Sequence, residues 1–476
     1  MATFDRHDPP TPESHWCAAP AWTQVAALDL TATAQRWSRV VVASAHPDDE
    51  TLGVGALVFD LAARGMSVTV IVATAGERSH EVADGAARSR LAQRRRREVE
   101  RAVAALAPTA RVVHCDYADT ELEGRVDVLA QELGGHLGAD SLLLAPWVHD
   151  GHADHDALGR AAQRAAAWTG AALAHYPVWM WHWSTPDEVA WGQVVAAEPS
   201  LSAIHRKRSA LECFTSQTMA WSGDPGRQDP TPLLDDQTLA RARRLVETVF
   251  DPAGTLPTVP ASALPQRNQD RSAVFDDMYR DGPDAWMVRG SFYERRRRSL
   301  VLSMLGRPEY RRGLEVGCAD GHLTSALVER VAELQALDVS SVAVDHARAA
   351  APHAHISVGA APAAIPPGPF DLVLISEVGY FLSPLEWLVT LQRARSVLAP
   401  DGELILCHWQ HPTTGVPLDG PTVHQQARDA WGPAAAHYGD ADVCIDLWTG
   451  ASSVAQREAR SGAGSTQDHP ETSPRE

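Results

Sequence analysis

Short apolar runs alternate with helix-like segments along most of this chain, and this alternation constrains the fold more than any other feature. The runs "RVVVASA", "SVTVIVATAG", "ARVVHCDY" and "SLLLAPW" are aliphatic or β-branched and end in turn residues, as buried strands do. They are followed by helical patterns such as "ETLGVGALVFDLAARG". Strands that alternate with helices predict a parallel sheet covered by helices. The pattern returns later with "RGLEVGC", "LQALDV", "FDLVLISEV" and "GELILCHW", so the sequence predicts two α/β domains in series.

Breaks in this pattern suggest where the domains begin and end. At 476 residues the chain is too long for one compact core. The stretch "DPAGTLPTVPASALPQRNQD" is rich in proline and has no sustained period, which is typical of a linker. The C-terminal stretch has few apolar residues to bury and is expected to be disordered. We therefore expect a loose lead-in, a first domain, a linker, a second domain and a tail over residues 1–35, 36–250, 251–270, 271–455 and 456–476.

Composition excludes some classes of partner. The formal net charge of -18 argues against binding to nucleic acid or to an anionic membrane surface. No apolar stretch approaches the roughly 20 residues needed to span a bilayer. The six cysteines are scattered without a CxxC pair, as expected of reduced thiols in a cytoplasmic protein. Nothing in the sequence predicts the oligomeric state.

Two acidic, histidine-bearing clusters follow predicted strands. "HPDDE" comes after the first strand, and "HDGHADHD" comes after "SLLLAPW". Either cluster alone could be a solvated turn, but crowded carboxylates are costly unless a cation lies among them. A catalytic zinc takes three protein ligands and leaves one position open, which His46, Asp49 and His155 could supply. Asp48 then remains as a candidate general base.

The pair "AHPDDE" and "HxDH" resembles the PIG-L/LmbE family of zinc-dependent N-acetyl deacetylases over about residues 38–250. The resemblance implies the same three ligands, with zinc or another divalent metal such as iron or manganese. It also implies that Asp48 activates water and that His152 stabilises the oxyanion or protonates the leaving amine. Asp154 would orient His152.

Two further features near this site have competing interpretations. By the same resemblance, Arg95 lies near a substrate hydroxyl, although "RRRR" is also typical of a solvated helix face. Tryptophans at period two in "HYPVWMWHW" indicate one face of a strand, which could stack on a sugar ring or pack in the core.

The second domain begins its own motif with "GLEVGCADGHLT", a strand that enters a glycine-bearing turn and then a helix. Glycines let the backbone approach a ligand closely. Asp338 ends the next strand, where its carboxylate could accept hydrogen bonds from both hydroxyls of a ribose. A dinucleotide site is the weaker alternative because "GCADG" lacks the GxGxxG spacing.

This arrangement resembles class I S-adenosyl-L-methionine-dependent methyltransferases, and within them the NodS-like N-methyltransferases, over about residues 272–412. Both domains would then have Rossmann-like folds. Ala319 replaces the middle glycine of the motif, which is tolerable if the backbone there avoids positive φ. Glu377 could face the methyl acceptor as a general base. The cofactor-binding residues implied by the resemblance are Glu315, Gly317, Gly321, Asp338, Trp286 and Tyr293, of which Trp286 and Tyr293 could instead form a helical core stripe.

These features together predict a bifunctional enzyme for a small amino-sugar substrate. Deacetylation would expose an amine, and the second domain would methylate it. One alternative keeps both activities but directs them to unrelated positions, with methylation of a hydroxyl. A second alternative makes the second domain a cofactor-binding module without turnover.

Overall fold

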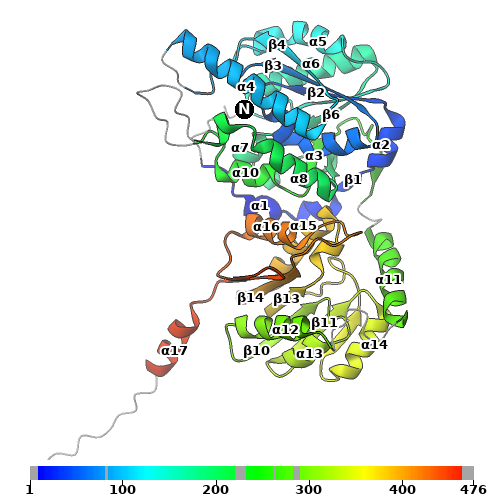
Figure 1. Ribbon diagram of the computed structural model, residues 1–476, viewed down its shortest axis with the longest axis vertical. Coiled ribbons are helices and arrows are strands. Elements are labelled where there is room, and N and C mark those ends of the chain that lie inside the picture. The colour runs from blue at the N-terminus through cyan, green and yellow to red at the C-terminus, as the bar shows by residue number, and fades with distance from the viewer. Residues whose placement is uncertain (1–8, 81–83, 220–231, 261–263, 282–289, 464–476) are drawn as a thin grey trace, which may run out of the picture. The chain divides into compact units, whose positions relative to one another are not determined.

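The computed structural model describes residues 9–80, 84–219, 232–260, 264–281 and 290–463 (Figure 1). The chain divides into two compact units. The first contains residues 1–265, 380–392 and 413–432, and the second contains residues 266–379, 393–412 and 433–476. The domain boundaries expected from the sequence remain predictions.

The first unit is built on a nine-stranded sheet in the order β4-β3-β2-β5-β6-β8-β7-β1-β9. Strands β4, β3, β2, β5 and β6 are parallel to one another, whereas β8 and β9 run antiparallel to their neighbours. The elements of this unit are α1 Glu13–Cys17, β1 Ala26–Leu28, α2 Leu30–Arg36, β2 Arg39–Ser44, α3 Asp49–Ala63, β3 Ser67–Thr74, α4 Gly85–Leu106, β4 Arg111–Tyr117, α5 Val126–Gly134, β5 Ser141–Pro146, α6 Ala153–Thr169, β6 Ala172–Tyr176, α7 Met180–Trp183, β7 Val194–Ala197, α8 Leu201–Leu211, α9 Thr215–Thr218, α10 Asp236–Ala242, β8 Glu247–Phe250, β9 Thr258–Val259 and α16 Gly420–Trp431.

Helices cover both faces of this sheet, which explains why its central strands are apolar throughout. In β2, Val40 and Val42 join one buried cluster with side chains of α3, α4 and α8. Val41 and Ala43 point to the opposite face and join a second cluster with side chains of α5 and α6. Alternate residues of each strand therefore face different helical layers.

The lead-in and the linker contain more regular structure than the sequence predicted. Trp16 and Trp22 of the lead-in are buried, and β1 pairs with β7 and β9. Within the expected linker, β9 extends the sheet, and α11 begins at Leu264. The expectation of a loose lead-in is therefore wrong. The predicted linker is interrupted by β9 and overlaps the start of α11.

The second unit has a seven-stranded sheet in the order β12-β11-β10-β13-β14-β16-β15, whose first five strands are parallel. Both units are thus mixed α/β structures with mostly parallel sheets, which confirms the predicted fold class. The remaining elements are α11 Leu264–Asp281, α12 Phe292–Met304, β10 Tyr310–Val316, α13 His322–Leu327, β11 Val331–Asp338, α14 Ser341–Ala350, β12 His355–Val358, β13 Phe370–Ser376, α15 Pro384–Val397, β14 Leu398–Trp409, β15 Ala436–Gly439, β16 Val443–Thr449 and α17 Val454–Ala463.

The predicted tail does not begin as an unstructured segment. Helix α17 covers its first residues, and residues 464–476 lie outside the described part of the chain. Among the helices of the described residues, none is long and apolar enough to cross a membrane.

Candidate active sites

The two histidine-bearing clusters meet because their strands are neighbours. Strands β2 and β5 pair in parallel, with Val42 opposite Leu144, so both strands end at the same edge of the sheet. The first cluster leads from β2 into α3, and the second leads from β5 into α6, whose N-cap is His152. This is the edge at which open α/β sheets bind ligands.

Three predicted ligands converge at this edge. His46 Nδ1 lies 3.2 Å from His155 Nε2 and 3.5 Å from Asp49 Oδ2, and His155 Nε2 lies 3.3 Å from Asp49 Oδ1. A tetrahedral zinc with bonds of about 2.0–2.1 Å places its ligand atoms about 3.3–3.4 Å apart. The separations between the side chains are close to these values, with Asp49 using a different carboxylate oxygen toward each histidine. His152 also brings a ring nitrogen to within 4.8 Å of those of His46 and His155.

Two buried carboxylates contact the other ring nitrogens of the histidines. Asp150 Oδ2 lies 2.8 Å from His155 Nδ1, and Asp119 Oδ1 lies 3.2 Å from His46 Nε2. Such partners fix the tautomer and orientation of metal-binding histidines. Neither aspartate is among the site residues predicted from the sequence. Asp150 lies within the second cluster, and Asp119 follows strand β4, so position after a strand was the available signal.

Asp48 has the environment expected of a general base. Its backbone adopts φ 136°, a strained conformation that is typical of functional sites. Burial raises the pKa of its carboxyl to about 7, although the guanidinium of Arg95 opposes this shift. A base with a pKa near 7 is well suited to accept a proton at neutral pH.

Arg95 does not belong to a solvated helix face. Only 3 % of it is exposed, and its Nη2 lies 3.0 Å from Asp48 Oδ2. It also donates to the carbonyls of Pro47 and Gly76, at 2.8 Å and 2.9 Å. A side chain at Gly76 would collide with the guanidinium, since a Cβ there would lie 1.9 Å from Arg95 Nη1. The structure thus shows Arg95 holding the general-base candidate, and its predicted contact with a substrate hydroxyl stays a prediction.

His152 and Asp154 complete this region. Burial, together with repulsion from His46 and His155, lowers the pKa of His152 to about 3, so its imidazole is neutral at neutral pH. The carboxylate of Asp154 accepts hydrogen bonds from the backbone N–H groups of Thr120 and Leu122 and lies 3.4 Å from His46 Nε2. Its predicted role in orienting His152 is not tested by these contacts.

The tryptophan-rich segment is not a strand, so the prediction from its period is wrong. Strand β6 ends at Tyr176, and Met180–Trp183 forms helix α7. The reason is a long-range contact: Asp150 accepts hydrogen bonds from the backbone N–H groups of Val178, Trp179 and Met180, which turns the chain.

The glycine-bearing turn of the second unit has the close approaches that require glycine. Gly317 and Gly321 both adopt φ 85°. A Cβ would lie 2.2 Å from Val378 Cγ2 at Gly317 and 2.7 Å from Ala347 Cα at Gly321. From the sequence, alanine is expected to be tolerated here if the backbone avoids positive φ. Ala319 adopts φ 48°, so alanine is strained at this position. Left-handed backbone costs a non-glycine residue about 1–2 kcal/mol.

Two acidic residues beside this turn, Glu315 in β10 and Asp338 at the end of β11, fit a nucleoside cofactor that carries a cation. Asp338 ends β11, and its carboxylate accepts from the backbone N–H groups of Ala319 and Ser340, both at 2.9 Å. Glu315 is buried, and among the described residues neither of its carboxylate oxygens has a partner in ordinary hydrogen-bond geometry, while the nearby hydroxyl of Thr324 partly opposes the rise in its pKa. Burial raises the pKa of Glu315 to about 7. An orphaned carboxylate of this kind fits a ligand with N–H or O–H donors, such as S-adenosylmethionine.

Glu377 lies beside this turn in an aromatic setting. It follows β13 with φ 59°, and its Oε2 accepts from the N–H of Trp409 at 3.3 Å. The rings of Tyr293 and Trp409 are edge to face with centroids 4.7 Å apart. The hydroxyl of Tyr293 is buried and has no hydrogen-bond partner within the described part of the chain. Tyr293 also packs against the core of the unit, and Trp286 lies outside the described residues.

Sequence models of two families match the parts of the chain that carry the candidate sites. The sequence model of the PIG-L family, described as GlcNAc-PI de-N-acetylase, matches residues 41–166, and a methyltransferase-domain model matches residues 314–402. The chain carries a PIG-L domain followed by a methyltransferase domain. The PIG-L match includes both histidine-bearing clusters, and the methyltransferase match includes the glycine-bearing turn and Asp338.

Similarity to individual proteins is more limited. The chain is 49% identical over 47 residues to 1D-myo-inositol 2-acetamido-2-deoxy-alpha-D-glucopyranoside deacetylase of Corynebacterium glutamicum (strain R), which is 10% of this chain and 16% of that protein. The chain thus spans about a sixth of the length of this curated relative.

Two solved structures resemble parts of the chain. N-methyltransferase NodS from Bradyrhizobium japonicum WM9, in complex with S-adenosyl-l-homocysteine, is 22% identical, covering 37% of this chain and 98% of NodS with a TM-score of 0.32. N,N'-diacetylchitobiose deacetylase from Pyrococcus horikoshii is 18% identical, covering 50% of this chain and 89% of that enzyme with a TM-score of 0.34. Such low TM-scores do not indicate a shared function.

Proposed function

We propose that the PIG-L domain removes an N-acetyl group from an amino sugar and that the methyltransferase domain then methylates the freed nitrogen. The observation that carries the first half is the convergence of His46, Asp49 and His155 at 3.2–3.5 Å, with Asp48 held beside them by Arg95. This arrangement provides both a set of potential metal ligands and, beside them, a buried carboxylate that can act as the base. Metal-dependent hydrolysis of an amide needs both parts.

In the proposed hydrolysis, His46, Asp49 and His155 would hold a divalent metal, zinc by the preference of this donor set. The bound ion would supply Lewis-acid chemistry. Asp48 takes a proton from the attacking water, whose oxygen forms a bond to the acyl carbon. The carbon–nitrogen bond then breaks as Asp48 returns this proton to the departing nitrogen, and the neutral His152 stabilises the oxyanion by donating a hydrogen bond. The products are a carboxylate and an amine.

The family and one relative support a 2-acetamido sugar as the substrate class. The matched family model is described by its de-N-acetylation of a GlcNAc derivative. The Corynebacterium relative is named for deacetylation of a 2-acetamido-2-deoxy-glucopyranoside. The family model matches the segment that carries the first site, so we extend an amino-sugar substrate to this chain as a proposal.

Deacetylation changes what the second domain can methylate. An amide nitrogen shares its lone pair with the carbonyl, whereas a free amine can attack the methyl group of S-adenosylmethionine. In the proposed transfer the nitrogen–methyl bond forms as the sulfur–methyl bond breaks, and S-adenosylhomocysteine leaves. Glu377 would take the proton lost by nitrogen. Glu315, Gly317, Gly321 and Asp338 would hold the cofactor.

Acetate release from a panel of N-acetylated amino sugars tests the first half of this proposal. We expect zinc-dependent release by the full-length protein and a loss of about 10²-fold or more in Asp48→Asn, in line with removal of a general base. Asp116→Asn, an exposed carboxylate of the same unit that pairs with Arg96, serves as the matched control and should retain most of the activity. Full activity of Asp48→Asn would contradict the proposal.

S-adenosylhomocysteine production tests the second half. With a free-amine sugar we expect turnover and a methyl group on nitrogen by mass spectrometry. Methylation of a hydroxyl would support two uncoupled activities. Binding of S-adenosylmethionine without turnover would indicate a module that only binds the cofactor.

A further inference from the structure

Helix α3, which begins at Asp49, is broken after its first turn. Val54 adopts φ −140° and ψ 20°, which is not helical. In an unbroken helix the N–H of Ala56 would donate to the carbonyl of Leu52, and the N–H of Leu57 to that of Gly53. The break interrupts this ladder between the first turn and the rest of the helix.

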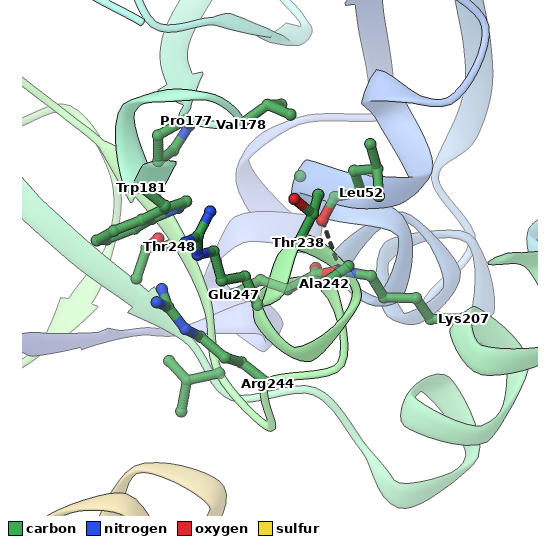
Figure 2. A pocket seen from close by; sticks show the side chains of 13 residues that line it. Leu52, Pro177, Val178, Trp181, Lys207, Thr238, Ala242, Arg244, Glu247 and Thr248 are labelled. Carbon is green, nitrogen blue, oxygen red and sulfur yellow. Dashed lines mark hydrogen bonds and ion pairs between the residues drawn. The ribbon is translucent and has the colours of Figure 1, made fainter. Parts of the chain in front are cut away.

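A buried ion pair binds the backbone groups on either side of the break. The carboxylate of Glu247, at the start of β8, accepts from the N–H groups of Ala56 and Leu57 at 2.9 Å and 2.7 Å. Lys207 of α8 donates to the carbonyl of Leu52 at 2.8 Å and to Glu247 Oε1 at 2.6 Å. Figure 2 shows Lys207, Glu247 and Leu52 together beside a small cavity. The two charged side chains are only 5% and 3% exposed.

The packing around the break connects it to the strand that precedes the metal site. A Cβ at Gly53 would lie 2.3 Å from the ring of Tyr176, so glycine allows this ring to pack against the first turn. The hydroxyl of Tyr176 donates to the carbonyl of Ala43 in β2 at 2.7 Å. Strand β2 leads directly to His46, and the first turn of α3 carries Asp49.

A continuous helix would satisfy its own backbone without any buried charge. Buried ion pairs seldom add net stability over apolar side chains of similar size, because desolvation is costly. The desolvation cost of burying Lys207 and Glu247 is therefore better explained by the backbone conformation that the two side chains impose on α3. We infer that Lys207 and Glu247 are positioning residues of the metal site, which hold α3 in its broken form and thereby set the direction of Asp48 and Asp49. This inference rests on the proposed metal-dependent function.

The zinc affinity of the full-length protein, measured by competition with a chelator, tests this inference. We expect Lys207→Met to weaken zinc binding by about tenfold or more, the effect typical of losing a residue that orients ligands. The matched control is Arg244→Met, which breaks another buried ion pair of the same unit, from Arg244 to Glu13 at 2.6 Å. It should lower stability without changing zinc affinity by more than about threefold.

A double variant separates positioning from simple stabilisation. Lys207→Met with Glu247→Met leaves no unpaired buried charge, so the stability lost in either single variant should return. Zinc affinity should stay low, because α3 can now form its ordinary ladder and the turn with Asp49 is no longer held. The cobalt-substituted protein should then show an altered visible spectrum.

The inference is overturned if zinc affinity returns together with stability in the double variant, or if Lys207→Met and Arg244→Met weaken binding equally. If Lys207→Met does not fold, the double variant still decides between these outcomes. A wild-type protein that binds no zinc would contradict the proposed deacetylation as well. Wild-type binding with unaltered affinity in the double variant would overturn this inference alone.

Discussion

Asp119 lies outside any recognised motif, yet its carboxylate contacts a histidine of the proposed metal site. It is 3 % exposed, contacts His46 Nε2 at 3.2 Å and accepts the N–H of Arg78 at 2.8 Å. His46 therefore has one nitrogen among the proposed ligand atoms and the other on a fixed carboxylate. This geometry is typical of histidines that bind zinc.

We predict that Asp119→Asn weakens zinc affinity by about 10- to 100-fold, the range found for loss of such outer partners. The control is Asp116→Asn on the same strand end, an exposed side chain that pairs with Arg96. It should leave zinc affinity unchanged in the same chelator competition. Equal affinities for the two variants would show that Asp119 does not orient His46.

Glu315 predicts a pH dependence of stability in the ligand-free protein. Its pKa of about 7 in the folded state lies above the value of about 4.3 in an unfolded chain. The folded state therefore binds the proton more tightly, so the free energy of unfolding falls as the pH rises from about 4 to about 7. The full effect is of the order of 3 kcal/mol.

Chemical denaturation at several pH values measures this effect. Glu315→Gln should be less sensitive to pH over this range than the wild type, and the exposed Glu309→Gln should behave like the wild type. Parallel curves for wild type and Glu315→Gln would show that this carboxylate does not titrate as predicted.

The position of two histidine-bearing clusters after predicted strands was enough to predict which residues gather in the first site. It was not enough to predict every contact within that site. The structure brings His46, Asp49 and His155 together because their clusters follow neighbouring parallel strands. The burial of Arg95 could not be predicted from "RRRR", because it depends on the carbonyl of Gly76 and on Asp48, which are distant in sequence.

At the scale of elements, most strands and helices follow from periodicity, and the exceptions have long-range causes. Continuous apolar runs predict β2, β3 and β5, because each strand is buried on both faces. Periodicity mispredicts the segment at α7, where Asp150 accepts three backbone N–H groups from residues about 30 positions away. It also gives no sign of the break in α3, because the Lys207–Glu247 pair comes from two later elements.

Two alanine-to-glycine substitutions should change the free energy of unfolding in opposite directions. One lies in the turn between β10 and α13, and the other lies in helix α14. Ala319→Gly should stabilise the protein by up to about 1 kcal/mol, because glycine adopts φ 48° without strain. Ala349→Gly, at an exposed position in α14, should destabilise it by about 1 kcal/mol. Unfolding in denaturant measures both, and a loss of stability in Ala319→Gly would contradict the strain assigned to this turn.

At the scale of the whole molecule, the two sites depend on different groups and should fail separately. Removal of metal with a chelator should abolish acetate release from the acetylated sugar, because the proposed ligands lie only in the PIG-L domain. Methyl transfer to a sugar that already carries a free amine should continue. If chelation stopped methyl transfer to the free amine as well, the two activities would not be separable in the way proposed.

In the proposed reaction sequence, hydrolysis prepares the nitrogen for methylation. The most direct test of this order of reactions is a mass-spectrometric time course of an N-acetylated amino sugar with the full-length protein, zinc and S-adenosylmethionine. We expect the free amine to accumulate first and the N-methyl product to follow at its expense, with neither formed by Asp48→Asn. Appearance of a methylated sugar that still carries its acetyl group would contradict this order.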